Sequence, residues 1–87
     1  MYEVLLHPDA QKVYLESSTI LAKKISRCLQ QLEQTPKLHP NIKVLKGDFA
    51  GYYRYRIGDY RVIYSVNDER MQVLVMAIAR RKEAYDP

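Results

Sequence analysis

The sequence predicts an α+β fold in which two N-terminal helices pack on one face of a mostly antiparallel four-stranded sheet. Two observations predict it. Apolar residues recur at helical spacing only in the first 35 residues, and in the segments 52–57 and 60–66 their period changes to two, as in half-buried strands. The 87 residues, 47% hydrophobic and 28% charged, are ordinary for one globular domain spanning 1–87. The expected order is β-α-α-β-β-β, followed by a short C-terminal tail or helix.

The N-terminal half is expected to supply one strand and both helices. In residues 2–6, Tyr2, Val4 and Leu6 alternate with Glu3 and Leu5, which predicts a short strand. A short helix should span 8–16, because a proline fits the first helical turn. The second helix follows the capping residues 17–19 and ends before Pro36, because the residue before a proline avoids helical angles. Its apolar stripe, expected to face the core, comprises Ile20, Leu21, Ile25, Cys28, Leu29 and Leu32.

The C-terminal half reads as strands. Residues 43–45 are a possible strand start in a long connection. The segments 52–57 and 60–66 flank Gly58-Asp59, which is a strong signal for a two-residue hairpin turn. Residues 71–79 are nearly continuous in apolar side chains, which predicts a central strand covered on both faces.

The hairpin turn determines which side chains share a face of the sheet. A two-residue turn places Arg56 opposite Arg61 and Arg54 opposite Ile63, so three arginines gather on one face. Directly opposed like charges destabilise a sheet unless an anion lies between them. This pattern predicts an anion-binding face, although acidic neighbours or plain solvation could also accommodate the arginines. The other face is apolar enough to lie under the helices and carries Tyr53, Tyr55, Ile57, Tyr60, Val62, Tyr64 and Val66.

The distribution of charge points to a nucleic acid or an acidic protein as partner. The chain has 14 basic and 10 acidic residues, a net charge of +4. The basic residues concentrate in the segment 43–61 and in the block 80–82. Tyr52 shares the arginine face and could stack on a base. His7 and His39 could act as an acid–base pair in RNA cleavage, but no predicted face brings them together.

Several other classes of protein are disfavoured. The sequence has no metal-ligand spacing and no glycine-rich phosphate loop, so no cofactor is expected. One cysteine excludes an internal disulfide, and Cys28 is expected in the core. The longest apolar run is too short for a membrane span, and the N-terminus has no signal-peptide pattern. We therefore expect a cytoplasmic protein with no membrane association.

Three stretches resemble the RelE toxins of the RelE/ParE superfamily of bacterial and archaeal toxin–antitoxin systems. They are Leu45-Lys46-Gly47, the hairpin from Tyr52 to Tyr64, and the closing Arg81-Lys82-Glu83-Ala84-Tyr85. The resemblance covers residues 2–85. It implies a RelE-like fold and a type II toxin that inhibits translation. The implied activity is that of a metal-independent mRNA interferase, a ribosome-dependent endoribonuclease that cuts mRNA in the A site when the 2′-OH attacks the adjacent phosphate. The implied partners are the ribosome, mRNA and a cognate antitoxin, RelB-like or of another family, with which the toxin forms a hetero-oligomer.

The resemblance also implies roles for individual residues. Arg61 corresponds to the arginine at the scissile phosphate, and Tyr85 to a C-terminal tyrosine near the nucleophile. The expected catalytic residues are Arg61, Arg81, Tyr85 and Arg54. The expected RNA-binding residues are Arg56, Tyr52, Lys46, Arg80 and Lys82. Some relatives carry lysines at the basic pair where this chain has Arg54 and Arg56. An arginine stays protonated and cannot act as a base, which leaves the identity of the general base open.

The register of the last strand decides which C-terminal arginine reaches the arginine face. A four-residue turn at 67–70 with regular pairing would place Arg80 there. A bulge would place Arg81 there instead, and the resemblance favours Arg81. Two alternatives to the ribonuclease stay open: a ParE-like inhibitor of DNA gyrase, and a non-catalytic module whose basic face binds an acidic partner.

Overall fold

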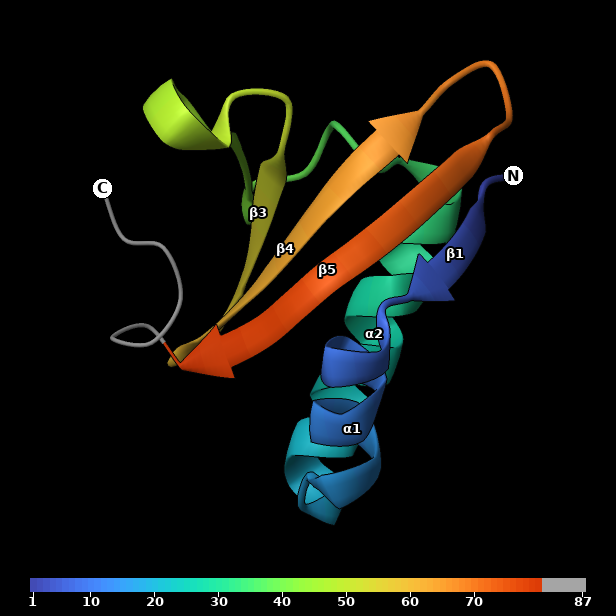
Figure 1. Cartoon of the computed structure of the whole chain (residues 1–87). Coiled ribbons are helices and arrows are strands. Elements are labelled where there is room, and N and C mark those ends of the chain that lie inside the picture. Colours follow the sequence, from blue (N-terminus) through green and yellow to red (C-terminus); the bar gives the residue numbers. More distant parts are fainter. Residues whose placement is uncertain (81–87) are drawn as a thin grey trace.

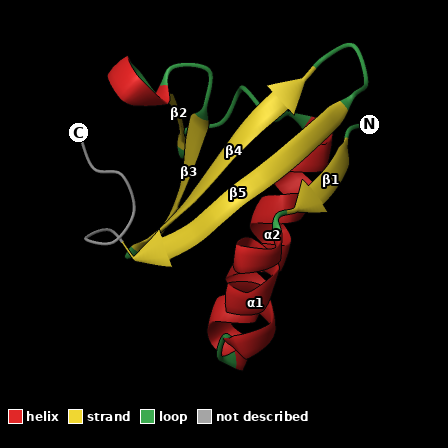
Figure 2. Cartoon of the chain, viewed as in Figure 1, coloured by secondary structure: helices red, strands yellow, loops and turns green. Residues whose placement is uncertain are grey.

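Five strands form one mixed sheet in the order β1-β5-β4-β3-β2, and both helices pack on the same face of it (Figures 1 and 2). The computed structural model describes residues 1–80. The elements in chain order are β1 (Glu3–Leu6), α1 (Pro8–Glu16), α2 (Thr19–Gln34), β2 (Ile42–Val44), the 3-10 turn η1 (Gly47–Phe49), β3 (Tyr53–Ile57), β4 (Tyr60–Asn67) and β5 (Gln72–Arg80). This confirms the α+β fold with two helices on one face. The expected C-terminal tail or helix lies outside the described residues.

Capping residues set the ends of the helices. His7 precedes α1, and its ring accepts a hydrogen bond from the Asp9 N–H at 3.1 Å. The hydroxyl of Ser18 accepts one from the Leu21 N–H at 3.2 Å and begins α2.

The expectation that Ile20 faces the core is wrong, since its side chain is 71% exposed. The first turn of α2 projects beyond the sheet, as Figure 1 shows, so the apolar stripe finds no partner there. Within residues 1–80, no helix is long and apolar enough to cross a membrane.

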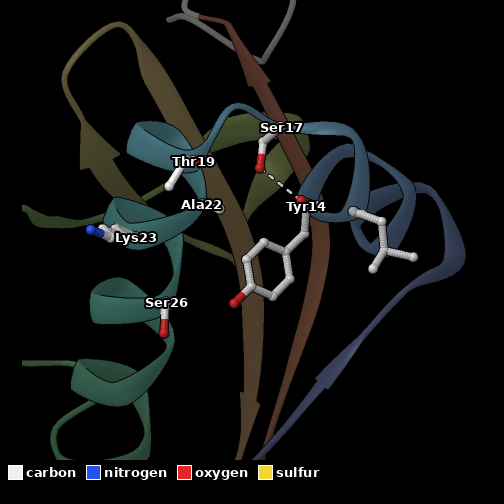
Figure 3. A pocket seen from close by; sticks show the side chains of 7 residues that line it. Tyr14, Ser17, Thr19, Ala22, Lys23 and Ser26 are labelled. Atoms are coloured by element: carbon white, nitrogen blue, oxygen red, sulfur yellow. Dashed lines mark hydrogen bonds between the residues drawn. The ribbon is translucent and has the colours of Figure 1, made fainter.

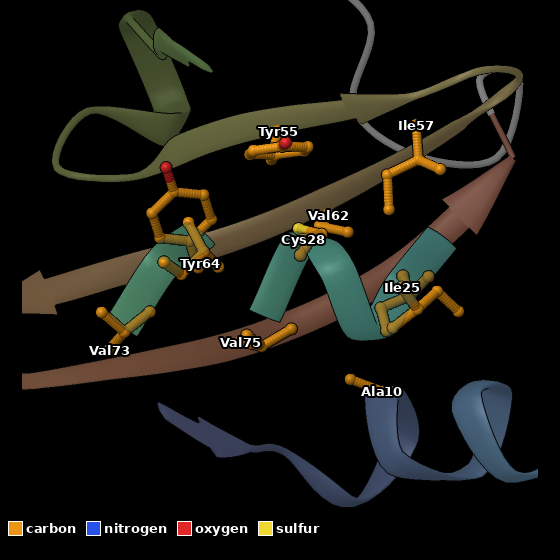
Figure 4. Close-up of a cluster of buried hydrophobic side chains, with 11 residues drawn as sticks. Ala10, Ile25, Cys28, Tyr55, Ile57, Val62, Tyr64, Val73 and Val75 are labelled. Carbon is orange, nitrogen blue, oxygen red and sulfur yellow. The ribbon is translucent and has the colours of Figure 1, made fainter. Parts of the chain in front are cut away.

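The main core lies between the helices and the sheet (Figure 4). It consists of Ala10, Ile25, Cys28, Leu32, Tyr55, Ile57, Val62, Tyr64, Val73, Val75 and Ile78. Burial of each large apolar side chain stabilises the fold by roughly 1.5–3 kcal/mol. Cys28 is in this core as predicted, and burial raises the pKa of its thiol to about 12.

The tyrosines predicted to lie in the core are on the face of the sheet that the helices cover. Tyr55 and Tyr64 are buried, and Tyr60 packs against the core from its rim. The Tyr64 hydroxyl donates a hydrogen bond to the Pro36 carbonyl at 2.6 Å, which satisfies both groups inside the core. Burial raises the pKa of Tyr64. The ring of Tyr53 stacks on that of Tyr64 with centroids 5.6 Å apart.

The sheet differs from the prediction in two respects. It has five strands instead of four, because residues 42–44 pair antiparallel with β3, while β1 pairs parallel with β5. The prediction that β5 is covered on both faces is also wrong. Val73 and Val75 are fully buried under the helices, but Leu74 between them is 38% exposed on the open face. A run of apolar residues therefore does not by itself show that a second layer covers the strand.

The hairpin pairing is confirmed residue by residue, with Arg56 opposite Arg61 and Arg54 opposite Ile63. The bulge in the last strand is confirmed as well. Ile63 pairs with Ala77 and the next residue, Tyr64, pairs with Val75, which leaves Met76 as the extra residue. The bulge changes the face on which every later residue of β5 lies.

Candidate functional site

Three arginines lie on the face of the sheet that the helices leave open. Arg54 and Arg56 belong to β3, and Arg61 belongs to β4 directly opposite Arg56. We call these three residues the arginine face. Arg56 is exposed, Arg54 is half-buried, and Arg61 is only 8% exposed. Across the next ladder Arg61 faces Ala79, whose small side chain limits crowding beside the guanidinium.

Arg61 is the one charged residue that is buried within residues 1–80. Removing a charge from water costs free energy unless other groups compensate it. A buried guanidinium also loses few rotamers when it binds an anion, because packing already holds it. Arg61 is therefore the member of the arginine face that is best prepared to hold a negative charge in a fixed position.

A fourth cation joins this face. Lys43 of β2 lies directly opposite Arg54 of β3, so the two side chains share a face, whereas the neighbouring Ile42 packs against the core. Lys43 is exposed. The sequence places Lys43 in a basic segment but does not indicate its face, because three residues at 42–44 give no signal of their pairing with the hairpin.

An aromatic hollow lies on the same face. Its volume is about 400 Å³, and it is lined by Asp48, Phe49, Tyr52, Ile63, Met76 and Ala77. Ile63, between Arg61 and the bulge, is 6% exposed and does not belong to the main core. Tyr52 lies on the face that the sequence predicts, whereas Phe49 beside it is not among the predicted residues. Lys46, a predicted RNA-binding residue, is exposed and immediately precedes η1.

Arg80, another predicted RNA-binding residue, is not on the arginine face. It pairs with Tyr60, on the other side of the sheet. Its Nε donates a hydrogen bond to the Tyr60 hydroxyl at 3.3 Å, and its guanidinium carbon lies 5.8 Å from the centre of the tyrosine ring. The bulge at Met76 causes this change of face. Arg81, Lys82 and Tyr85 lie outside the described residues, so their assignment stays a prediction.

The two histidines are at opposite edges of the sheet. His7 follows β1 at one edge, and His39 precedes β2 at the other. His39 stacks on Tyr55 with ring centroids 5.1 Å apart, and its Nδ1 accepts a hydrogen bond from the Asn41 N–H. Their separation on the sheet disfavours an acid–base pair. Within residues 1–80, no three His, Cys, Asp or Glu side chains gather as a metal site would require.

A second groove lies between the two helices (Figure 3). Tyr14 and Leu15 from α1 and Ala22 and Lys23 from α2 are among its lining residues, and its volume is about 530 Å³. The hydroxyl of Ser17 donates to the Tyr14 carbonyl at 2.7 Å and closes the turn between the helices. This groove belongs to the helix layer and not to the arginine face.

Comparison with known proteins identifies the family. A family model described as "ParE toxin of type II toxin-antitoxin system, parDE" matches residues 4–85. The chain belongs to this toxin family, within the RelE/ParE superfamily. Toxin RelE of Mycobacterium tuberculosis (strain ATCC 25618 / H37Rv) is 42% identical over 43 residues, which cover 49% of this chain and 44% of that toxin. The matched stretch is thus less than half of the M. tuberculosis protein.

Solved structures have the same fold over nearly the whole chain. A chain of the archaeal RelE–RelB complex from Pyrococcus horikoshii OT3 superposes with a TM-score of 0.81 at 28% identity, covering 95% of this chain and 98% of that one. A chain of the RelBE2 toxin–antitoxin complex from M. tuberculosis superposes with a TM-score of 0.77 at 26% identity, covering 92% of this chain and 91% of that one. The predicted RelE-like fold is therefore confirmed.

Proposed function

We propose that this toxin is a ribosome-dependent mRNA endoribonuclease that cuts the message in the A site and so inhibits translation. The observation that carries the proposal is the arginine face, where Arg61 is buried opposite Arg56 on a side of the sheet that no helix covers. The similarity to RelE toxins supports it. The activity implies a cytoplasmic location, where ribosomes and mRNA meet.

The proposed reaction is a transfer within the RNA strand. The 2′-OH oxygen forms a bond to the adjacent phosphorus, its proton leaves, and the bond from phosphorus to the 5′-oxygen breaks. The products are a 2′,3′-cyclic phosphate upstream and a 5′-hydroxyl downstream, with the leaving oxygen taking up a proton. Negative charge accumulates on the phosphoryl oxygens on the way. Arg61, with Arg56 beside it, is the group that would stabilise this charge, without a metal ion.

The remaining roles fall to three of the predicted residues and to Lys43. Arg54 and Lys43, opposed on the same face, would hold the neighbouring phosphates in line. Arg81 would neutralise charge on the leaving 5′-oxygen. Tyr85 would orient or deprotonate the 2′-OH. The arginine face itself offers no base, so catalysis would depend mainly on positioning and charge stabilisation, to which an ordered message in the A site contributes.

The aromatic hollow would hold a nucleobase of the RNA. Tyr52 and Phe49 contribute aromatic rings to its lining and Ile63 and Ala77 contribute apolar side chains, and the volume of about 400 Å³ leaves room for a nucleobase. Ile63 lies directly opposite Arg54 in the ladder. A nucleotide whose phosphate meets the arginines could therefore place its base in this hollow.

We also infer a cognate antitoxin. The P. horikoshii and M. tuberculosis structures are toxin–antitoxin complexes. A partner with an amphipathic helix and acidic side chains would suit this chain, because it could cover the arginine face and neutralise the crowded cations. RelB-like antitoxins are one candidate class, and the toxin would then be part of a hetero-oligomer.

A second candidate function is inhibition of DNA gyrase. The matching family model is described by the name of the ParE toxins, and that match spans residues 4–85. The basic face would then bind gyrase or its DNA instead of mRNA. A third candidate is a non-catalytic module whose basic face binds an acidic partner. Such a module would bind its partner without cleaving RNA or inhibiting gyrase.

The experiment compares three substrates with one toxin preparation. mRNA bound to programmed ribosomes, the same mRNA free in solution, and gyrase with relaxed plasmid are each incubated with the toxin. We expect rapid cleavage only on the ribosome, with a 2′,3′-cyclic phosphate at the new upstream end. A block of supercoiling without cleavage would establish the ParE-like function instead, and a 3′-hydroxyl product would contradict the proposed chemistry.

A further inference from the structure

A second basic site lies around the edge of β3, on the side of the helices. A surface hollow of about 240 Å³ is found there, and Lys24 and Arg27 of α2 line it together with Arg56 of β3. The other lining residues are Cys28, Asn41, Tyr55, Ile57 and Gly58. The hollow belongs neither to the groove between the helices nor to the aromatic hollow.

Its position follows from the shortness of β2. That strand pairs only with residues 53–55, so the last two residues of β3 have no partner strand at this edge. The Arg56 N–H instead donates a hydrogen bond to the Asn41 carbonyl at 3.0 Å. The side chains of α2 can therefore border the hairpin directly where a longer β2 would have separated them.

The hollow is unusually rich in positive charge. Three of its eight lining residues are cations, and none is acidic. Lys24 and Arg27 are three positions apart on α2, which places them on the same side of the helix, and both are exposed. Like charges held around one hollow repel each other, so the arrangement favours an anionic ligand. Burial raises the pKa of the Tyr55 phenol, which therefore stays protonated in the lining.

Arg56 connects this hollow to the arginine face. It lines the hollow and also lies opposite Arg61 across the hairpin. Cations thus continue from α2 around the edge of β3 to the proposed cleavage site. A polymer with one phosphate per residue matches such a tract better than a protein with a few carboxylates, because every step of its backbone carries a charge.

We propose that the hollow between α2 and the edge of β3 binds the phosphate backbone of RNA outside the segment that is cut. The inference builds on the proposed ribonuclease function and extends the RNA-binding surface to the helix layer. Within this hollow Lys24 and Arg27 are binding residues and take no part in the chemistry.

The test uses the double variant Lys24→Gln/Arg27→Gln and a matched control, Lys12→Gln/Arg70→Gln. Each removes one lysine and one arginine, and none of the four side chains is buried. Glutamine preserves helix propensity in α2. Binding to a fluorescent single-stranded 2′-O-methyl RNA, which cannot be cut by 2′-OH attack, is followed by anisotropy between roughly 50 and 200 mM salt.

We expect the hollow variant to lose about tenfold or more in affinity, and the slope of log affinity against log salt to fall in magnitude by about 1.4, the value for two lost contacts with a single strand. The control should keep the wild-type slope. Equal losses in both variants would show an effect of net charge only and would overturn the proposal. Unchanged RNA binding with weakened antitoxin binding would also overturn it, in favour of a protein partner. Because this RNA cannot be cleaved, the result does not depend on whether the toxin is a ribonuclease.

Discussion

The two faces of the sheet are made by the same strands but differ in what lies against them. One face is covered by both helices and contains the main core, in which Tyr64, Val73 and Val75 are fully buried. The other carries the arginine face, where Arg61 is buried although no helix covers it. Side chains alternate between faces along a strand, so one hairpin contributes every second residue to the core and the arginines to the open face. Substitutions on the two faces should therefore have separable effects.

The largest expected contrast compares two leucines. Leu32 is fully buried in α2, and Leu74 is 38% exposed on the open face of β5. Leu32→Ala should lower the free energy of unfolding by about 2–5 kcal/mol, because it leaves a cavity. Leu74→Ala should cost less than about 1 kcal/mol. Chemical denaturation of both variants measures the difference. Similar losses in the two would mean that the open face is covered by protein after all.

A smaller effect, of opposite sign, is expected on the arginine face. Arg56→Gln removes one of two directly opposed like charges, and such pairs destabilise a sheet by roughly 0.2–1 kcal/mol. The variant should therefore be slightly more stable at low salt, and the gain should shrink as salt screens the repulsion. Arg70→Gln in the turn before β5 is the control and should leave stability nearly unchanged. A loss of stability in Arg56→Gln would show that Arg56 is structural.

The smallest effect concerns the hydrogen bonds that Asp68 accepts from Lys37 and Tyr2. Asp68, in the turn after β4, accepts hydrogen bonds from Lys37 Nζ at 2.5 Å and from the Tyr2 hydroxyl at 2.8 Å, and these bonds lower the pKa of its carboxyl group. A lowered pKa in the folded state stabilises the protein above the unfolded value of about 3.9, and the benefit is lost as the pH falls through the folded pKa. The stability difference between wild type and Asp68→Asn should be constant near neutral pH and shrink below about pH 4. A difference that grows on acidification would contradict this.

Local rules are enough to predict much of the fold. Capping residues and Pro8 indicate the helix boundaries, and the two-residue turn at Gly58-Asp59 fixes the pairing of Arg56 with Arg61. Strand β2 is only suggested by the sequence, because three residues are too few to show a period of two. The exposure of Ile20 and of Leu74 depends on where the layers end, which a residue pattern does not encode.

The site is predictable only in part for the same reason. The three arginines follow from the hairpin register, but Lys43 joins them only through the pairing of β2. Phe49 reaches the aromatic hollow because η1 is placed by tertiary contacts, and no sequence signal marks it. Regular pairing would have put Arg80 on the arginine face. The bulge at Met76 moves it off, and the sequence indicates that bulge only through the resemblance to RelE toxins.

The most direct test of the account replaces Arg61. Arg61→Ala and the control Arg70→Ala are compared in single-turnover cleavage of ribosome-bound mRNA, with folding checked by circular dichroism and denaturation. Loss of one donor to the transition state typically costs about 100-fold or more in rate. We expect a loss of this size for Arg61→Ala in a protein that still folds, and a rate close to that of wild type for Arg70→Ala. A folded Arg61→Ala variant that cleaves at the wild-type rate would contradict the central claim that the arginine face is the catalytic surface.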